Sequence, residues 1–499
     1  MRDNFNPEIL TLLEIIQEEL SSGEDLYLVG GAVRDLLLKR ELHDLDFVMD
    51  EDPRPLAKRV AMRLNLDFFV LDDVRHTARV VYYNAEGDLA PLDFVEFTGT
   101  TLEEDLRNRD FTINAMAVSI RDLSSLIDPL GGEDDLAECM LIPCSVHALV
   151  DDPVRVLRGI RFVHQFHLAY ASSLPEQMEE AATLLQKTSN ERQRDEFFRI
   201  LESPLPASGL SDCYRFKVFE TLIPPLVEQA FVPASPPHVL PLLDHTLSVV
   251  EHCDWLLKYL YQGDEEAAGS HWWQGKNLSA LLTYSSDLEA YFDEEITLGR
   301  RKRSLMLFGA LLHDIGKPLT MKMGEDGRLH FYSHDRVGAD IAWEIAKSLQ
   351  LSNAESDWLG TLVRCHMRIL PMVNAEQPPD RRSIFRFFGQ TGEVGVAVVL
   401  LSLADTLATY GNTLSEDKWK QAIIVAKALL SAWWDQRNRL VDPQPLLDGD
   451  ELQDMFGLKP GKQIGKLLYS LREVQAAGEI MSKEEAISFI KARLPSKTH

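Results

Sequence analysis

The chain has 499 residues, a length that predicts roughly three to four domains. With 45% hydrophobic and 26% charged residues, its composition is that of an ordinary globular protein. Its formal net charge of -27 argues against indiscriminate nucleic-acid binding, so any contact with a polyanion must use a local basic patch. No apolar run approaches the roughly 20 residues of a membrane span, and the acidic start lacks the features of a signal peptide, so we expect a cytoplasmic protein without a membrane partner.

The N-terminal part is predicted to contain a helix, a strand and a glycine turn. Residues 8–20 have apolar positions at helical spacing. Residues 26–29 form a short apolar run, and Gly30 and Gly31 then permit a sharp turn into a second helix. Free N–H groups at the start of that helix would form a phosphate-binding site.

Two carboxylates follow this helix. Asp44 and Asp46 flank Leu45, and a period of two places both carboxylates on one face of a strand while Leu45 points into the core. Paired carboxylates repel each other unless a divalent cation neutralises them, and hard oxygen ligands suit Mg²⁺ held jointly with substrate phosphates. The pattern therefore indicates metal-assisted phosphoryl chemistry.

A small mixed sheet is predicted next. Residues 53–64 read as a helix, and three β-branched and aromatic runs follow at 67–73, 77–83 and 90–97. Asp93 lies in the last run, in a strand that could pair beside the Asp44 and Asp46 strand. It is our candidate third carboxylate, and the alternative is a strand residue that faces solvent.

Further polar residues precede the helical part of the chain. Arg109 and Asp110 lie before an apolar segment and can offer a guanidinium and a carboxylate to sugar hydroxyls or phosphates. Residues 126–136 read as a glycine turn followed by a helix start, which we interpret as a hinge between the sheet domain and the following domain.

Beyond residue 137 the chain is predicted to be almost wholly helical. Asp152 and Arg155 lie three residues apart, so we expect them on one helix face, with Arg158 near it. A carboxylate beside a guanidinium can imitate the edge of a base, although an ordinary surface ion pair gives the same pattern. Residues 189–201 are interpreted as a structural helix that braces its neighbour.

Together these segments resemble the bacterial-type (class II) tRNA nucleotidyltransferases, the family of CCA-adding enzymes and poly(A) polymerases. The resemblance rests on an ordered series of motifs over residues 26–201: LVGGAVRDLLL with HDLDF, RNRDFTINAMAV, DPLGGEDDL, DDPVRVLRGIRF and NERQRDEFFRIL. It implies an enzyme that extends tRNA 3′ ends with CTP and ATP. A poly(A) polymerase, which would use ATP alone, is the main alternative.

The resemblance also implies residue roles. Asp44 and Asp46 would be catalytic metal ligands, with Asp93 as the third carboxylate. Arg109 and Asp110 would contact the sugar. The residues implied to bind the triphosphate, the sugar or the base are Gly30, Gly31, Arg34, Arg109, Asp110, Asp152, Arg155, Arg158 and Arg161.

Three departures from the family pattern bear on specificity. Asn108 stands where the family usually has Arg, and Asp151 stands where it usually has Glu. Only residues 98–101 separate the last predicted strand from the next helix, whereas CCA-adding members resemble each other in a longer flexible segment there. The short segment resembles CC-adding members, so CC addition is favoured and CCA addition stays open.

A second set of metal-ligand residues lies beyond the proline-rich boundary at residues 233–237. Its histidines and aspartates are His245, His313, Asp314, His334, His366 and Asp405. Such ligands suit Zn²⁺, Mn²⁺, Ni²⁺ or Fe. The set, and LLHDIGKP above all, resembles the HD phosphohydrolase superfamily, which implies a first metal at His245, His313, Asp314 and Asp405 and a second role for His334 and His366. The resemblance further implies hydrolysis of 2′,3′-cyclic or simple phosphate esters. An HD phosphohydrolase whose head is inactive is another alternative for the whole chain.

The C-terminal part is the expected basic patch. Lys459, Lys462 and Lys466 lie in a Gly/Pro-punctuated loop that enters a helix, where they could bind a phosphate backbone or simply form a solvated face. The overall prediction is an α+β fold: a polymerase-β-like nucleotidyltransferase head with a small mixed sheet, then an all-helical neck, HD domain and tail. The predicted boundaries are 1–136, 137–232, 233–412 and 413–499, in a monomer or homodimer.

Overall fold

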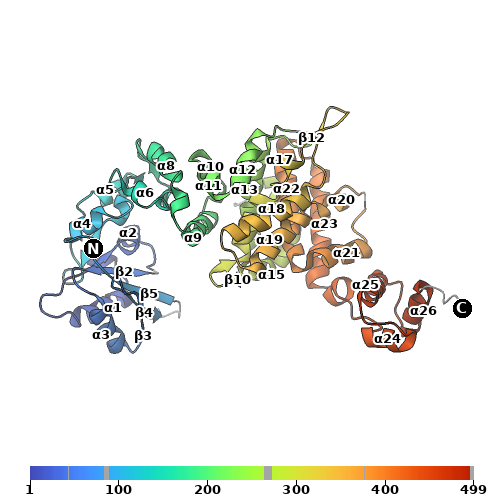
Figure 1. Ribbon diagram of the computed structural model, residues 1–499, viewed down its shortest axis with the longest axis horizontal. Helices are drawn as coiled ribbons and strands as arrows, with labels where there is room; N and C mark the ends of the chain where they lie inside the picture. The colour runs from blue at the N-terminus through green and yellow to red at the C-terminus, as the bar shows by residue number, and fades with distance from the viewer. Residues whose placement is uncertain (43, 84–88, 263–271, 376, 495–499) are drawn as a thin grey trace. The chain divides into compact units, whose positions relative to one another are not determined.

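The structure, a computed structural model, describes residues 1–42, 44–83, 89–262, 272–375 and 377–494 (Figure 1). The chain forms two compact units. The first comprises Met1–Pro204 and Asp212–Leu222, and the second comprises Leu205–Ser211 and Ile223–His499. The predicted head falls in the first unit and the predicted HD domain and tail fall in the second.

The first unit is built around a seven-stranded mixed sheet with the strand order β3-β4-β5-β2-β1-β6-β7. Its strands are β1 (Leu26–Val29), β2 (Leu45–Met49), β3 (Asp67–Asp72), β4 (Thr77–Tyr83), β5 (Leu89–Glu96), β6 (Ala117–Ser119) and β7 (Leu126–Ile127). Strands β2 and β5 are parallel, and the other neighbours are antiparallel. The small mixed sheet and the α+β class expected from the sequence are thus confirmed.

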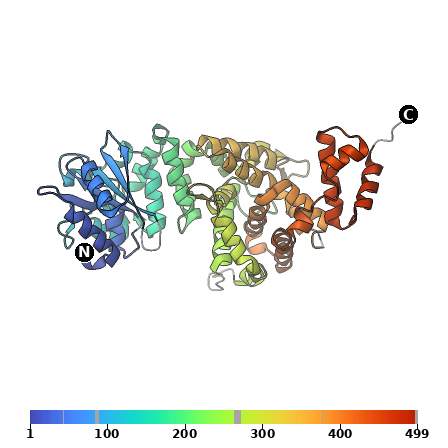
Figure 2. The same cartoon turned by 90° about the horizontal axis from the view of Figure 1, so that it is seen from below.

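The alternation of residues along β2 explains how the sheet joins a core to a polar surface. Leu45, Phe47 and Met49 are almost fully buried and belong to the core of the unit. That core also takes residues from α1 (Pro7–Glu18), α2 (Gly31–Leu37) and α3 (Arg54–Leu64), whose apolar positions recur at helical spacing. Figure 2 shows the strands and these helices from a second side.

Short helices complete the first unit. They are α4 (Leu102–Arg107), α5 (Gly132–Ala137), α6 (Ala148–Asp151), α7 (Arg155–Phe166), α8 (Leu174–Ala182), α9 (Asn190–Leu201) and α11 (Val218–Leu222), whereas α10 (Pro206–Arg215) is shared with the second unit. Helices α7 and α9 pack against each other. The sequence therefore located this helical region correctly.

The expectation that Asp152 and Arg155 share one helix face is wrong. Helix α6 ends at Asp151, Asp152 is extended with φ -140° and ψ 91°, and Arg155 is the first residue of α7. Pro153 supplies the reason, because a proline disfavours helical geometry in the residue before it.

The second unit is helical. Its longer helices are α13 (Leu242–Gln262), α15 (Ser285–Asp293), α16 (Lys302–Leu312), α18 (His334–Ser348), α19 (Asn353–Cys365), α21 (Arg381–Thr391), α22 (Gly395–Tyr410), α23 (Glu416–Trp434), α24 (Gly449–Phe456), α25 (Lys462–Ala477) and α26 (Lys483–Arg493). Helix α22 packs against α13, α19 and α23. Among the described residues, one helical stretch, Arg381–Thr413, is long and apolar enough to cross a membrane, but 78% of its apolar window is buried inside the fold. It is the core of this unit.

Candidate active site and candidate metal centre

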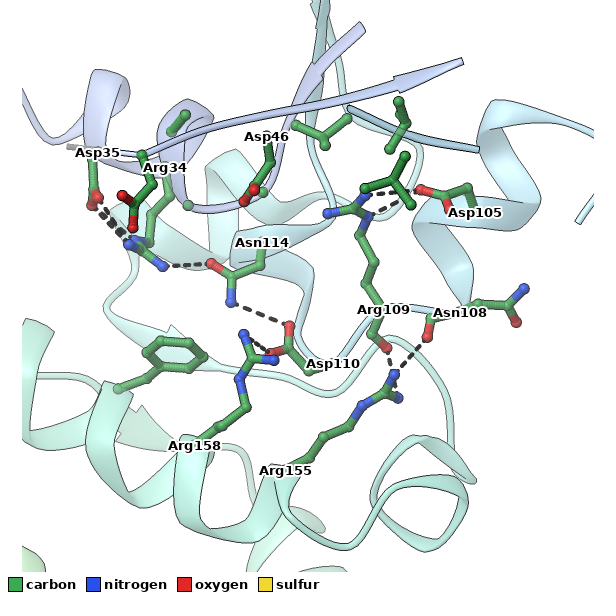
Figure 3. A pocket seen from close by; sticks show the side chains of 18 of the residues that line it. Arg34, Asp35, Asp46, Asp105, Asn108, Arg109, Asp110, Asn114, Arg155 and Arg158 are labelled. Carbon is green, nitrogen blue, oxygen red and sulfur yellow. Dashed lines mark hydrogen bonds and ion pairs between the residues drawn. The ribbon is translucent and has the colours of Figure 1, made fainter. Parts of the chain in front are cut away.

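A cavity of about 580 Å³ opens in the first unit between the β1–α2 turn, β2, α4 and α7. Figure 3 shows side chains from all of these segments converging on it. Of the nucleotide-binding and catalytic residues predicted in the head and neck, Asp93 lies outside the lining of this cavity. The others line it: Gly30, Gly31, Arg34, Asp44, Asp46, Arg109, Asp110, Asp152, Arg155, Arg158 and Arg161. The fold thus brings side chains that are up to 131 positions apart in the sequence, from Gly30 to Arg161, to the lining of one cavity.

The turn after β1 requires glycine at position 30. Gly30 has φ 72°, a conformation that side-chain-bearing residues rarely adopt. A Cβ atom there would lie 3.1 Å from Arg109 Nη1 and 3.7 Å from Asp46 Oδ2. The missing side chain therefore lets a guanidinium and a carboxylate approach the backbone of the turn.

The carboxylates lie at adjacent strands. Asp44 is exposed and immediately precedes β2, Asp46 lies within β2, and Asp93 of β5 is paired in register with Asp46. Burial, followed by repulsion from Asp93, raises the pKa of Asp46 to about 6. A divalent cation would relieve both costs, so Asp44 and Asp46 fit a metal that binds oxygen.

Asp93 itself forms an ion pair with Arg79. Its Oδ1 and Oδ2 accept hydrogen bonds from Arg79 Nε and Nη2 of β4, each at 2.7 Å. A bidentate pair of this kind fixes the carboxylate in orientation. Asp93 thus lies beside Asp46 in the sheet but outside the lining of the cavity.

Asp110 is the buried acceptor at the centre of the polar network. Asn114 Nδ2 donates to its Oδ1 at 3.2 Å, and Arg158 Nη2 lies 3.1 Å from its Oδ2. Although burial alone would raise it, the pKa of Asp110 is lowered, chiefly by Arg158. Asn114 also accepts a hydrogen bond from Arg34 Nη1 at 2.6 Å, so one amide connects Asp110 to α2 (Figure 3).

Arg34 and Arg161 are held by the protein itself. Arg34 is 7% exposed, donates to Asp35 through Nε and Nη2, and lies over the ring of Phe166 at 4.3 Å. Arg161 Nε donates to Glu196 of α9 at 2.9 Å and its guanidinium lies 4.3 Å from the ring of Phe162. Both residues shape the wall of the cavity through these contacts.

Asp152 has a partner that the sequence interpretation missed. Arg192 of α9 donates to both of its carboxylate oxygens, at 3.1 and 2.7 Å. Arg155 Nε lies 3.9 Å from Asp152 Oδ2, so the two predicted partners are adjacent although they share no helix face. Helix α9 therefore supplies a hydrogen-bond donor to Asp152, where we expected only a structural brace.

A buried group of histidines and aspartates occupies the second unit. His245 lies on α13, His313 and Asp314 follow α16, His334 begins α18, His366 follows α19 and Asp405 lies on α22. The side chain of Asp314 joins two potential ligand sets, one with His245 and His313 and one with His334 and His366. Five of the six residues predicted from the sequence form these sets, and the sixth, Asp405, lies with its Oδ1 3.2 Å from His245 Nε2.

The distances suit coordination on both sides of Asp314. Its Oδ2 lies 3.2 Å from His313 Nε2 and 3.7 Å from His245 Nε2, and its Oδ1 lies 3.4 Å from His334 Nε2 and 3.6 Å from His366 Nε2. Two ligand sets that share one carboxylate can hold two cations.

Backbone carbonyls orient the imidazoles. Nδ1 of His313, His334 and His366 each lies 2.6–2.8 Å from the carbonyl oxygen three residues earlier, which leaves Nε2 directed inward. Among the described residues, His245 Nε2, His313 Nε2 and Asp314 Oδ1 are buried without a hydrogen-bond partner. Buried polar atoms in that state fit transition-metal ligands.

Lys317 was missed by the sequence interpretation. Its Nζ lies 2.5 Å from Asp314 Oδ2 and 3.3 Å from His238 Nε2. Although burial opposes it, this ammonium keeps the pKa of Asp314 well below its usual range. The signal was present in HDIGK, because a spacing of three places a lysine beside the preceding aspartate.

Comparisons with known proteins match both units. A Poly A polymerase head domain matches residues 26–142, a probable RNA and SrmB-binding site of polymerase A matches 172–229, and an HD domain matches 242–410. The A-adding tRNA nucleotidyltransferase of Deinococcus radiodurans is 30% identical over 470 residues, which cover 93% of this chain and 94% of that protein.

The chain belongs to the tRNA nucleotidyltransferase family. The CC-adding tRNA nucleotidyltransferase of Thermus thermophilus is likewise 30% identical, over 94% of this chain and 93% of the relative. A solved CCA-adding enzyme in an apo form has the same fold, with a TM-score of 0.65, 20% identity and coverage of 99% of this chain and 96% of the other. This nucleotidyltransferase is therefore an RNA-extending enzyme that carries an HD domain.

The tail of this nucleotidyltransferase has its own small core, formed by α24, α25 and α26. Lys462 and Lys466 lie one turn apart on α25 and border a surface hollow with Tyr469. Lys459 precedes them in the loop, and all three lysines are exposed. The basic loop and helix start expected from the sequence are present, while their contact with tRNA stays a prediction.

Proposed function

We propose that this nucleotidyltransferase adds two cytidines to the 3′ end of tRNA in the cavity around Asp46. The observation that supports CC addition is the short connection between β5, which ends at Glu96, and α4, which begins at Leu102. Side chains of α4 hold it: Asp105 accepts from Thr98 N at 2.9 Å and Glu104 accepts from Thr100 N at 2.7 Å. A connection tied to its own helix has little freedom to reshape the pocket for a second base.

The reaction is an in-line attack of the RNA 3′ hydroxyl on the α-phosphate of the incoming nucleotide, with pyrophosphate as the leaving group. Asp44 and Asp46 would hold Mg²⁺, which when bound stabilises the attacking and leaving oxygens. Arg109 lies against the Gly30 turn, where its Nη1 can bind a phosphate oxygen. Asp93, which pairs with Asp46 in the sheet and lies outside the cavity lining, would add its negative charge to the metal site.

Base selection is assigned to Asp152 and Arg155. Cytosine carries an amino donor beside ring acceptors, which complement a carboxylate acceptor and a guanidinium donor respectively. Asp110, fixed by Asn114 and Arg158, would accept from a sugar hydroxyl.

Product analysis tests the proposal. We incubate the enzyme with CTP and ATP together with either a tRNA that lacks CCA or a tRNA that ends in CC. We expect two cytidines on the first substrate and no extension of the second. A complete CCA end on the first substrate contradicts the proposal, and long adenosine tails from ATP alone would identify a poly(A) polymerase.

A-addition is the second candidate, because the Deinococcus relative named for it matches the chain at the same identity as the Thermus CC-adding relative. The same experiment decides between them. An A-adding enzyme would leave the tRNA without CCA unchanged and would add one adenosine to the tRNA that ends in CC.

The HD domain supports a phosphohydrolase activity as a second reaction. The two ligand sets around Asp314 carry this proposal, with Ni²⁺, Mn²⁺, Zn²⁺ or Fe as the metal. We expect Asp314→Asn to lose bound metal by elemental analysis and to lose phosphate release from 2′,3′-cyclic nucleotides, while tRNA extension stays within about twofold. Asp340→Asn, on exposed α18 surface, is the control. Equal phosphate release by wild type and Asp314→Asn would refute the activity.

A further inference from the structure

Asn108 lies where the β5–α4 connection meets the base-reading arginine. Its side-chain Nδ2 donates to the carbonyl oxygen of Thr98 at 3.1 Å. Its own backbone carbonyl oxygen accepts a hydrogen bond from Arg155 Nη2 at 2.8 Å (Figure 3). One residue therefore touches both the connection and the guanidinium proposed to read the base.

Backbone carbonyls determine where the Arg155 guanidinium lies. Besides Asn108, its Nη1 donates to the carbonyl oxygens of Arg109 at 3.1 Å and Ala148 at 3.0 Å. Three charge-assisted hydrogen bonds to fixed acceptors leave the planar guanidinium little rotational freedom. The path of the backbone at residues 108–109 thus sets the direction of its remaining donors.

Both backbone polar groups of Thr98, its N–H and its carbonyl oxygen, are hydrogen-bonded to side chains. Asp105, which is 5% exposed, accepts from Thr98 N through Oδ1 and from Arg109 Nε and Nη2 through Oδ2, at 3.1 and 3.0 Å. Together with the Asn108 hydrogen bond this forms what we call the Thr98 clamp, comprising Asp105, Asn108 and Thr98. The clamp connects the β5–α4 connection to Arg109 and, through Asn108, to Arg155.

We propose that Asn108 and Asp105 are positioning residues for nucleobase selection, acting through the Thr98 clamp on Arg155. With the clamp closed, Arg155 keeps one position and the pocket accepts one class of base. With the clamp open, the backbone at residues 108–109 shifts, Arg155 samples several positions and discrimination between CTP and ATP falls. This inference deepens the proposed function and rests on its assignment of Arg155 to base reading.

Asn108→Ala is the informative variant, because it removes the donor to Thr98 and keeps the backbone carbonyl that binds Arg155. Asn108 and Thr98 are both exposed, so water can replace the lost partner and the Tm should stay unchanged. Asn108→Gln keeps the amide and should restore part of the effect. Glu103→Ala is the matched control, because Glu103 lies on the same helix and forms an exposed ion pair with Arg107.

The readout is the ratio of kcat/KM for CTP to kcat/KM for ATP, measured with a tRNA that lacks CCA and with one that ends in CC. We expect Asn108→Ala to change this ratio about tenfold toward the disfavoured nucleotide, with Glu103→Ala unchanged. An unchanged ratio, with or without an equal loss of activity for both nucleotides, would overturn the proposal. If the wild type adds adenosine, the proposed CC addition fails, whereas the clamp is still judged by the change in the ratio.

Discussion

The protonation of one carboxylate, Asp46, would compete with the metal that we propose for the head cavity. Because the pKa of Asp46 is raised to about 6 by burial and by Asp93, the side chain is partly protonated in mildly acidic solution when no cation is bound. Because the folded, metal-free protein binds this proton more tightly than the unfolded chain does, the raised pKa of Asp46 stabilises the fold at low pH. This contribution to the free energy of unfolding is lost as the pH rises through about 6. Cation affinity must change in the opposite direction.

We therefore predict that Mn²⁺ binding to the head weakens as the pH falls below about 6, by up to about tenfold per pH unit, since one proton competes with the cation. Electron paramagnetic resonance of free Mn²⁺ between pH 5 and 7.5 measures this. The Asp314→Asn background removes the HD contribution. Affinity that does not vary with pH would contradict the assignment.

The sequence predicted which residues line the head cavity, but it did not predict the side chains that hydrogen-bond to them. The motifs predicted Asp46, Asp110 and Arg155 because each residue type carries its chemistry in the side chain. Asn114 and Arg192 were missed because their contacts with Arg34 and Asp152 span 80 and 40 residues and follow from packing rather than from local spacing.

Among the elements, the turn into α5 supports the segment that carries Asp110. A Cβ atom at Gly132 would lie 2.2 Å from the backbone carbonyl oxygen of Thr112, and Asp128 accepts from Gly132 N at 2.8 Å. The backbone at Thr112 cannot yield as a flexible side chain would. Position 132, which we interpreted from the sequence as part of a hinge, is therefore glycine because the backbones at residues 112 and 132 approach each other closely.

Gly132→Ala should lower the free energy of unfolding by about 1–3 kcal/mol, because the added methyl group overpacks a backbone contact. Thermal or urea denaturation followed by circular dichroism measures the change. Glu133→Ala, at the next and exposed position, should stay within about 0.5 kcal/mol. Equal stability of the two variants would show that the Gly132 contact is dispensable.

Element prediction succeeded where periodicity was strong. Strands β3, β4 and β5 were located within a few residues, because β-branched and aromatic runs between turn residues specify them. The break between α6 and α7 was missed, although Pro153 supplied the signal, because the apolar spacing continues across it. Apolar periodicity alone does not reveal this interruption of three residues, 152–154.

For the whole molecule, the candidate active-site cavity lies in the first unit and the candidate HD metal centre in the second, and the tail carries a local basic surface on an acidic chain. The net charge of -27 means that electrostatic attraction to tRNA must come from such surfaces. Lys459, Lys462 and Lys466 are the exposed lysines that the sequence singled out.

Replacing these three lysines by alanine should weaken tRNA binding and reduce the slope of log affinity against log salt concentration by about two to three, since each lost phosphate contact releases about one counterion fewer. Filter binding at several salt concentrations measures the slope. Lys420→Ala, a lysine paired with Glu416 on α23, should leave the slope unchanged. An unaltered slope in the triple variant would remove the tail from the tRNA interface.

The most direct test of the account is tRNA extension by Asp46→Asn, which keeps the size of the side chain and removes its charge. We predict that nucleotide addition falls by about a thousandfold, because a metal ligand that stabilises the transferring phosphate is lost. Binding of tRNA and phosphate release by the HD domain should be retained, and Asp50→Asn, at an exposed position just past β2, should extend tRNA normally. Extension by Asp46→Asn at a near-normal rate would contradict the placement of the active site in this cavity.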